Sequence, residues 1–346
     1  MGSGNLTAGD WIIWSNCLWF KDFPKKSEMG FIPEKKKLNP GEFDFDKDFE
    51  DSLKNFLASL MPNRAKYTDL LDVNIDDYYI SDVDIVLIPS VPGRHKDQDF
   101  DKYGHRRVAS IVKQLYPTVA PAKKKKYVLT YQSSSIGALD EKFLREICSS
   151  FIPGYMTLDE LKNEKKLSKK ASGIDLGDSA TRRVRLIFPS KDYVENCTEG
   201  AQYSGCLILA PETYNKESFP KDIFYQFQAP EHYAFHEGII PHLKVWVVTD
   251  ESGEIDDDTI IYFGSHNLSP SAWGRYEKDY TQLSIANSEL GVLLPPMKGN
   301  TLYRLINYLG SKQRKQKLIN SLSFKFPPKK YEKNQVPWIF RLHFTS

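Results

Sequence analysis

Short apolar runs that alternate with amphipathic segments constrain the fold of this chain more than any other sequence feature. Two segments, Phe45–Met61 and Arg106–Tyr116, place apolar residues at helical spacing and are predicted to be helices. Four short runs are predicted to be strands of a sheet: Ser81–Ile88, Tyr127–Tyr131, Val184–Phe188 and Thr259–Phe263. This alternation is typical of a layered α/β fold, in which helices cover a central sheet.

Other segments carry weaker patterns. Leu161–Ser179 is rich in Lys, Ser and Gly and lacks periodicity, which predicts a mobile surface insertion. Leu302–Leu309 and Ser311–Leu322 are predicted to be helical, with a break at Gly310. The tail from Pro327 is predicted to be extended.

Three polar residues stand where predicted strands begin or end: His242, Lys244 and Asn267. Because strand side chains alternate, His242 and Lys244 would project from the same face. A turn near residues 250–258 returns the strand Thr259–Phe263, whose end brings Asn267 close to that pair. An imidazole, an ammonium and an amide together suit a phosphate ester. The ammonium and the amide would hold the non-bridging oxygens, and the imidazole would attack phosphorus or move the proton.

The overall charge gives no strong attraction to nucleic acid. The chain has 47 basic and 45 acidic residues, a formal net charge of +2, so any DNA binding must come from a local patch. The densest basic run, Lys123–Lys126, is expected to be a solvated loop; phosphate steering and nuclear import are the alternatives.

Cysteine usage and hydropathy indicate a soluble intracellular protein. The four cysteines show neither Cys-x-x-Cys spacing nor a zinc-binding pattern, which suggests reduced thiols. No apolar run approaches the ~20 residues that a membrane-spanning helix needs, and no signal peptide opens the chain. We therefore expect no membrane association.

The residues around the His-x-Lys pair resemble the motifs of the tyrosyl-DNA phosphodiesterases, a DNA-repair family of the phospholipase D superfamily. That family follows His-x-Lys with a distant Asn, where other members of the superfamily carry an Asp a few residues on. Asn267 lies in SHNLSPSAWG, and the second motif of the family reads S-x-N-L-S with A-W-G close behind. Further segments resemble the family in the same order: Ile88–Arg94, Ser133–Asp140, Ile187–Val194, Glu289–Leu293 and Pro337–Phe340.

The resemblance implies a layered α/β/α sandwich of the phospholipase D type. The full enzyme of this family has two similar α/β halves, each of which donates one His-Lys-Asn set to a cleft between them. On that mapping, residues 5–79 are the C-terminal end of the first half and residues 80–346 are the second half. Residues 1–4 look like a cloning remnant. The chain contains no second His-x-Lys, so we expect it to lack the nucleophilic His and the Lys of the first set.

The resemblance also implies catalytic roles. In the family, one His attacks phosphorus and forms a phosphohistidine, while the second protonates the leaving tyrosine and then activates water. His242 takes the second role, for which a well-placed proton donor is worth about 10²–10⁴ in rate. Lys244 and Asn267 would stabilise charge on the phosphorane. The alternative for His242 is a structural histidine on a strand. Asn5 resembles the closing Asn of the first motif and would be a phosphate ligand.

Family members orient each catalytic imidazole with a further side chain. Glu289 matches the Glu that holds the first His, with a buried, paired carboxylate as the alternative. Asn16 stands where the family has the Gln that holds the second His, and its shorter amide reaches less far. His266 is expected on the surface, with an added hydrogen-bond donor at the site as the alternative.

Four residues are candidates for substrate contacts. Ser134 and Ser135 match family serines that contact DNA phosphates, and they could equally cap a helix. A third family serine is replaced here by Ala138. Ser269 is expected to cap the next helix or line the site. Phe340 occupies a family aromatic position near the peptide side of the cleft, with core packing as the alternative.

The resemblance predicts a hydrolase that cleaves the 3′-phosphotyrosyl bond between DNA and a topoisomerase tyrosine. No cofactor or metal is implied, because two Lys and two His could neutralise the phosphoryl oxygens. The expected partners are DNA with a 3′-phosphotyrosyl or other 3′-blocked end and a topoisomerase-derived peptide. The protein is expected to be a nuclear monomer, and this chain alone to be inactive or severely impaired.

Two alternatives stay open at the level of sequence. The chain could be a non-catalytic module that binds DNA 3′ ends. It could also be a homodimeric phosphodiesterase with one motif per subunit, in which two copies of His242 meet across a two-fold axis.

Overall fold

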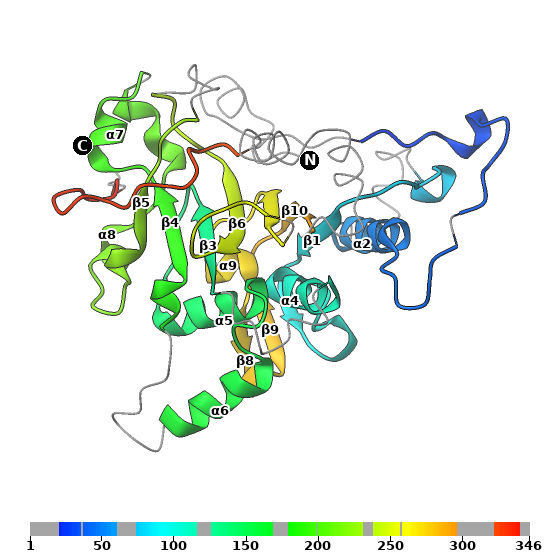
Figure 1. Cartoon of the computed structure of the whole chain (residues 1–346), viewed down its shortest axis with the longest axis horizontal. Coiled ribbons are helices and arrows are strands. Elements are labelled where there is room, and N and C mark those ends of the chain that lie inside the picture. The colour runs from blue at the N-terminus through cyan, green and yellow to red at the C-terminus, as the bar shows by residue number, and fades with distance from the viewer. Residues whose placement is uncertain are drawn as a thin grey trace.

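A large mixed sheet forms the centre of the molecule (Figure 1). This computed structural model describes residues 21–35, 37–60, 74–115, 126–168, 179–198, 200–230, 238–256, 258–295 and 322–339, without the side chains of residues 164–168. Within these ranges the sheet has seven strands in the order β1-β10-β7-β6-β3-β4-β5. Their bounds are β1 Val86–Ser90, β3 Tyr127–Gln132, β4 Val184–Phe188, β5 Phe224–Gln226, β6 Lys244–Asp250, β7 Ile260–Gly264 and β10 Glu289–Leu294.

Strands β3, β4 and β5 are parallel, and the remaining neighbours in the sheet are antiparallel. A smaller sheet has the order β2-β9-β8, with bounds β2 Gly93–His95, β8 Arg275–Glu277 and β9 Gln282–Ile285. The helices are α2 Phe45–Leu60, α4 Gly104–Leu115, α5 Glu141–Phe151, α6 Leu158–Ser168, α7 Lys191–Glu195, α8 Pro211–Tyr214 and α9 Pro270–Trp273. Short 3₁₀ turns are η1 Lys26–Glu28, η2 Ile75–Asp77, η3 Asp97–Asp99, η4 Ala180–Arg182, η5 Ala201–Cys206, η6 Lys221–Ile223 and η8 Lys278–Tyr280.

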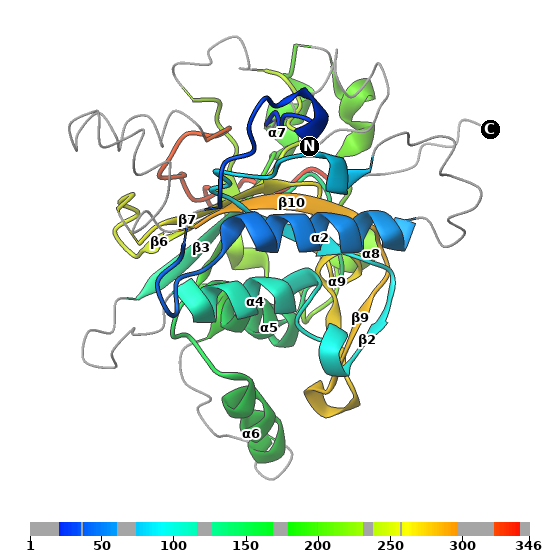
Figure 2. The ribbon, with the colours of Figure 1, turned by 90° about the vertical axis from the view of Figure 1, so that its right-hand side faces the viewer.

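Both faces of the large sheet bury apolar side chains. On one face, α4, α5 and α9 pack on a core in which the Phe151 and Trp246 rings stack with their centroids 4.5 Å apart. The opposite face buries a second cluster, to which Phe227, Leu322 and Phe324 contribute. Figure 2 shows α4 and α5 together on one side of the sheet, and Figure 1 shows α2 next to β1. Strands covered on both faces read as continuous apolar runs, which explains the buried segments in the sequence.

Helix α2 packs at the β1 edge of the sheet. Its Phe49 belongs to the same buried cluster as Leu87, whereas the next residue of β1, Ile88, belongs to the core on the α4 face. An ion pair between Arg107 Nη2 of α4 and Asp48 Oδ1 of α2, 2.6 Å apart, joins the two helices beside this edge. The mixed α/β fold expected from the sequence is therefore confirmed.

Most of the predicted elements are present with small changes of boundary. β4 has the predicted bounds, β3 extends one residue further, and β7 begins one residue later. The prediction that a strand begins at Ser81 is wrong, since β1 begins at Val86. Asp82 has a φ of 53°, which interrupts an extended backbone, and the Val83 amide donates to Asp46 Oδ1 rather than to a neighbouring strand.

The prediction of an unpatterned insertion at Leu161–Ser179 is wrong for its first part, which lies in α6. Thr157 and Glu160 form a capping box: the Glu160 amide donates to Thr157 Oγ1 at 3.2 Å, and Glu160 Oε2 accepts from the Thr157 amide at 2.7 Å. Leu161 is buried in the cluster beneath the small sheet, beside Tyr276 and Leu283. The capping box and the buried Leu161 therefore stabilise α6, which the hydrophobic periodicity of the sequence did not indicate.

The last predicted helices, residues 302–309 and 311–322, lie outside the described residues except for Leu322, which is not in a helix. The tail is described from 322 to 339 and runs along the outer edge of β5. The Gln226 amide donates to Lys329 O at 2.7 Å, and Tyr225 forms an antiparallel bridge with Lys330. The tail thereby covers the sheet edge that β5 would otherwise present.

A carboxylate is buried between α5 and β8, away from the strand ends described below. Glu146 is fully buried; its Oε2 accepts from the Tyr276 amide at 3.4 Å, and Lys142 lies 3.6 Å from Oε1. Burial raises the pKa of Glu146 to about 7, although Lys142 and Arg275 oppose this shift. The protonated form is therefore the stable form in the folded protein up to near neutral pH.

We expect Glu146 to make the protein less stable as pH rises from 4.5 through 7. Unfolded Glu146 loses its proton near pH 4.5, whereas the folded protein keeps it until about 7. The contribution of Glu146 to the free energy of unfolding is therefore complete below pH 4.5 and is lost as pH rises past 7, a decrease of about 3 kcal/mol. Urea unfolding at pH 4.5 and pH 8 measures this, with Glu146→Gln as the control that lacks the titration. Parallel pH profiles for the wild type and Glu146→Gln would contradict it.

Candidate active site

The candidate catalytic residues gather at one edge of the large sheet. β1 and β7 end there with Ser90 and Gly264, and β6 and β10 begin there with Lys244 and Glu289. The register pairs Lys244 with Gly264, and Ser90 with Glu289. The parallel strands β3, β4 and β5 also end at this edge, so seven strand termini from distant parts of the described sequence converge on it.

Lys244 opens β6 with its ammonium held in place by the backbone. The residue is 2% exposed, and Nζ donates to His242 O at 2.7 Å. Val245 belongs to the core on the opposite face, so the alternation of β6 places Lys244 on the same side as Trp246. His242 precedes the strand and is half-buried. The Lys244 ammonium is thus held by the backbone of the predicted catalytic His.

Asn267 is oriented by the turn that follows β3. Its Oδ1 accepts from the Ser135 amide at 2.9 Å and lies 3.2 Å from Ser134 Oγ and 3.1 Å from Ser133 Oγ. Because donors converge on this one atom, it must be the carboxamide oxygen. The two N–H groups of Asn267 consequently point away from the turn, as donors for an anionic ligand would.

The reading of Ser134 and Ser135 as helix caps is wrong. The N-cap of α5 is Asp140, whose Oδ1 accepts from the Phe143 amide at 2.7 Å. Ser134 is fully buried behind Asn267, whereas Ser135 is half-buried. Direct contact with a phosphate is therefore open to Ser135, and Ser134 contributes by holding Asn267.

Ser269 caps a helix, as one of its two predicted roles required. Its Oγ accepts from the Ala272 amide at 3.2 Å, which makes Ser269 the N-cap of α9. The turns that carry Asn267 and Ser135 pack closely, since a Cβ on Gly137 would lie 2.6 Å from the Ser269 Cβ. A glycine is needed at 137 for this approach, which fixes the two turns relative to each other.

His266 is a buried residue, and the expectation of a surface histidine is wrong. Its Nδ1 is hydrogen-bonded to Tyr262 Oη, and its Nε2 lies 2.9 Å from Ser90 Oγ. Ser90 Oγ donates to Ala272 O at 2.6 Å, so it accepts from Nε2 and the proton of this neutral imidazole resides there. Burial lowers the pKa of His266 to about 3, which keeps the ring neutral.

The backbone of His266 is fixed as well. Its carbonyl accepts from Tyr131 Oη at 2.7 Å, so the chain next to Asn267 is held both through the His266 ring and through this carbonyl. The alternation of Ile260 and Tyr262, continued past the strand, could have indicated this buried position.

Glu289 lies near Lys244 at the start of β10. Its Oε1 accepts from Asn287 Nδ2 at 3.1 Å. Burial raises the pKa of Glu289, while Ser265, Asn287 and the Lys244 ammonium act in the opposite direction. The carboxylate is thus half-buried and accepts a hydrogen bond within the chain, and both of its predicted readings stay predictions.

Three predicted site residues, Asn5, Asn16 and Phe340, lie outside the described residues. In the part of the chain that the structure describes, no three His, Cys, Asp or Glu side chains are placed to hold a metal ion. No helix among the described residues is long and apolar enough to cross a membrane.

The chain is similar to known proteins over almost its whole length. The family model "Tyrosyl-DNA phosphodiesterase" matches residues 1–332. Tyrosyl-DNA phosphodiesterase 1 of Arabidopsis thaliana is 27% identical over 97% of this chain and 55% of its own length. The Drosophila melanogaster protein of the same name is 26% identical over 86% of this chain and 47% of its own length. The chain thus spans about half the length of the curated relatives it matches.

Solved structures support the fold. The crystal structure of the yeast tyrosyl-DNA phosphodiesterase aligns with a TM-score of 0.59 at 16% identity, covering 99% of this chain and 73% of the yeast chain. A histidine-to-alanine mutant of the yeast protein aligns with a TM-score of 0.58 at 15% identity, over 98% of this chain and 73% of the yeast chain. With the family model matched from residue 1 to residue 332, the chain belongs to the tyrosyl-DNA phosphodiesterase family.

Proposed function

We propose that this protein hydrolyses the bond between a DNA 3′-phosphate and a tyrosine, and that His242 moves the protons. The observation that carries the proposal is the placement of Lys244 and of the oriented Asn267 amide at the sheet edge where His242 lies. A phosphoryl group bound there would meet an ammonium and two amide N–H donors, which together offset the charge that builds up on its oxygens.

In the proposed reaction, a nucleophilic imidazole forms a bond to phosphorus and the bond from phosphorus to the tyrosine oxygen breaks. His242 gives a proton to the departing tyrosinate. It then takes a proton from the water that cleaves the phosphohistidine, which restores both imidazoles. The protein's own cations carry the electrostatic stabilisation, so the proposed reaction requires no metal.

The proposed nucleophile belongs to a second His-Lys-Asn set. His242 and Lys244 are the one His-x-Lys pair in the 346 residues, so this chain supplies the acid/base half of the site. Glu289, already partly buried near Lys244, would accept a hydrogen bond from the imidazole of the second set and orient it. Residues 5–79 would belong to the half that carries this set, and residues 80–346 to the half described above.

The proposed partners are a DNA 3′ end that bears a phosphotyrosyl group, and the topoisomerase-derived peptide attached to it. The nucleus is the proposed location, because such adducts arise on chromosomal DNA, and a monomer is the proposed state. A non-catalytic module that binds 3′ ends is the second candidate, and the single His-x-Lys pair favours it for this chain alone.

Cleavage of an oligonucleotide with a 3′-phosphotyrosine, followed on a gel in EDTA, tests the proposal. We expect this chain to bind the oligonucleotide and to release little or no tyrosine. Addition of a polypeptide that carries the first His-Lys set should restore cleavage, and His242→Ala should abolish the restored activity.

Product formed by this chain alone and lost in His242→Ala would point instead to a homodimeric site. Sedimentation would then have to show a dimer. Failure to bind any 3′-phosphorylated end would overturn both the phosphodiesterase and the binding module.

A further inference from the structure

Hydrogen bonds from α7 and the residues after it hold the backbone that leads to His242. Gly238 O accepts from the Thr198 amide at 2.8 Å, and Ile239 O accepts from Tyr193 Oη at 3.0 Å. Both carbonyls belong to the segment that runs into β6 through His242. Of these two donors, the Tyr193 hydroxyl is the side-chain group, so a substitution can remove it and leave the backbone intact.

Apolar burial anchors the same segment on both sides of His242. Ile240 is fully buried in the core on the α5 face, and Leu243 is buried in the cluster on the opposite face of the sheet. Burial of apolar groups has no preferred direction, whereas a hydrogen bond depends on the angle at which its donor approaches. The two apolar side chains therefore set how deep the segment lies, and the bond from Tyr193 sets how it is turned.

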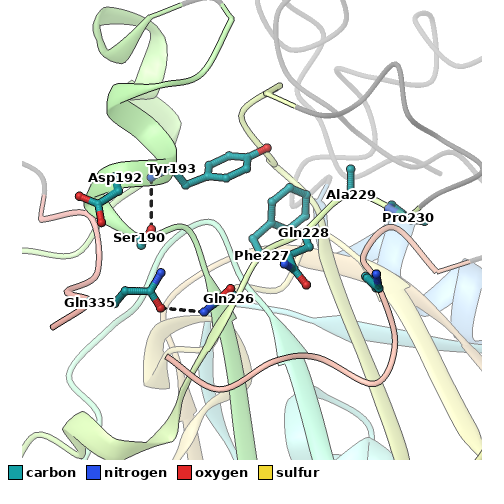
Figure 3. Close-up of a pocket in the computed structure, with 10 residues that line it drawn as sticks. Ser190, Asp192, Tyr193, Gln226, Phe227, Gln228, Ala229, Pro230 and Gln335 are labelled. Carbon is teal, nitrogen blue, oxygen red and sulfur yellow. Dashed lines mark hydrogen bonds between the residues drawn. The ribbon is translucent and has the colours of Figure 1, made fainter. Parts of the chain in front are cut away.

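Tyr193 is itself held firmly. Ser190 Oγ accepts from the Tyr193 amide at 3.2 Å and caps α7. The Tyr193 and Phe227 rings meet edge to face with their centroids 5.4 Å apart, at the wall of a pocket shown in Figure 3. The next residue of α7, Val194, is fully buried in the core. The Tyr193 hydroxyl consequently reaches Ile239 from a fixed position.

The beginning of α7 is fastened to the C-terminal tail as well as to β4. The Lys191 amide donates to Val336 O at 2.9 Å, and the Trp338 amide donates to Pro189 O at 3.0 Å. Hydrogen bonds thus connect the tail to α7, and Tyr193 connects α7 to the segment before His242.

The strand order explains why α7 reaches this segment. β4 is two positions from β6 in the order β6-β3-β4, α7 follows β4, and the segment with His242 enters β6. Tyr193 therefore spans the end of β3. The turn that leaves β3 at this end orients Asn267 through the Ser135 amide. The supports of His242 and Asn267 accordingly meet around one strand end.

We propose that Tyr193 is a positioning residue for His242. Its hydroxyl fixes the Ile239 carbonyl and thereby the direction from which the His242 imidazole meets a phosphate ester. Tyr193 acts through the backbone and forms no bond to the reacting atoms. The proton-transfer role of His242 rests on the proposed function, whereas the support that Tyr193 gives to His242 is a property of this chain alone.

Heteronuclear NMR spectra of the imidazole groups test the proposal without substrate. The chain has seven histidines, and the spectrum of His242→Ala identifies the signals of His242. Tyr193→Phe removes the hydrogen bond to Ile239 and keeps the ring that packs on Phe227. We expect the His242 signals to shift in this variant.

Tyr331→Phe is the matched control. Tyr331 is also a half-buried tyrosine whose hydroxyl donates to a backbone carbonyl, that of Phe188, at 2.7 Å. This variant loses the same kind of hydrogen bond outside the segment that carries His242. Its His242 signals should coincide with those of the wild type.

Gly238→Ala disturbs the same segment by a second route. Gly238 has a φ of 79°, which disfavours a side chain, and a Cβ there would lie 2.6 Å from Thr198 Oγ1. We expect the His242 signals to shift as they do in Tyr193→Phe. Urea unfolding shows whether each variant is folded, and Tyr193→Phe decides the question alone if Gly238→Ala is not.

Cleavage of the 3′-phosphotyrosyl oligonucleotide gives the kinetic readout, with the polypeptide that carries the first His-Lys set added. Tyr193→Phe should lower kcat about tenfold, because a misplaced proton donor slows the chemical step. KM should stay within about twofold, since the Ser135 turn still orients Asn267. Tyr331→Phe should cleave as the wild type does.

Unchanged His242 signals in Tyr193→Phe would overturn the proposal, and so would equal shifts in Tyr331→Phe. A raised KM with an unchanged kcat would also overturn it, because the hydroxyl would then serve binding rather than proton transfer. Absence of cleavage by the supplemented wild type would refute the proposed function. The NMR comparison would still decide whether Tyr193 positions His242.

Discussion

Replacement of Lys244 with methionine is expected to weaken binding of a 3′-phosphorylated oligonucleotide about 30- to 150-fold. The ammonium is buried at the sheet edge, held by His242 O, and would form a charge-assisted hydrogen bond to the phosphate worth about 2–3 kcal/mol. Methionine keeps the length and apolar character of the stem that packs in β6, so the effect should come from the lost charge rather than from a cavity.

The same oligonucleotide with a 3′-hydroxyl is the reference ligand for this variant. Its affinity should change little, because most of its contacts lie along the backbone of the DNA. Circular dichroism and urea unfolding of Lys244→Met check that the fold is retained. Equal loss of affinity for both ligands would show that Lys244 supports the surface in general and does not read the terminal phosphate.

Replacement of Gly291 with alanine is expected to destabilise the protein by about 3 kcal/mol. A Cβ at this position would lie 2.2 Å from Tyr262 Oη and 2.4 Å from two ring carbons of the same side chain. Gly291 pairs with Gly264, where a Cβ would lie 2.1 Å from the same hydroxyl. Because Gly264 and Gly291 lack side chains, there is room for the Tyr262 phenol over these two neighbouring strands. An added methyl group would overpack this space and force the ring to move. Movement of the ring also breaks its hydrogen bond to His266.

Urea unfolding of Gly291→Ala measures this loss, and Gly205→Ala is its matched control because a Cβ at 205 meets nothing within 4 Å. Tyr262→Phe combined with Gly291→Ala should recover part of the stability, since it removes the closest atom. Recovery should be incomplete because the ring carbons remain close. Additive effects of the two substitutions would contradict a direct clash between Gly291 and Tyr262.

Local patterns in the sequence predict much of the secondary structure. Buried strands such as Val184–Phe188 and the amphipathic α2 follow from periodicity, which depends on near neighbours alone. The strand start at Ser81 was wrong because the left-handed backbone at Asp82 carries no periodic signal. The capping box is visible in the sequence as Thr157 followed three residues later by Glu160, but it produces no hydrophobic periodicity.

The sequence by itself determined the family motifs and the placing of His242, Lys244 and Asn267 at strand ends. Period-2 alternation and the length of a turn are local properties, so they can be predicted without knowing which strands pair with each other. The orientation of Asn267 depended on the Ser135 turn, 132 residues away in the chain. The burial of His266 depended on Ser90, 176 residues away.

A pocket lined by Ser190, Gln226 and Gln335 (Figure 3) was also decided by the tertiary structure, because these residues come from three separate segments. Which segments meet is set by the order of strands in the sheet and by the tail that covers β5. That order results from the burial of many apolar side chains at once, a cooperative balance that no single window of sequence contains.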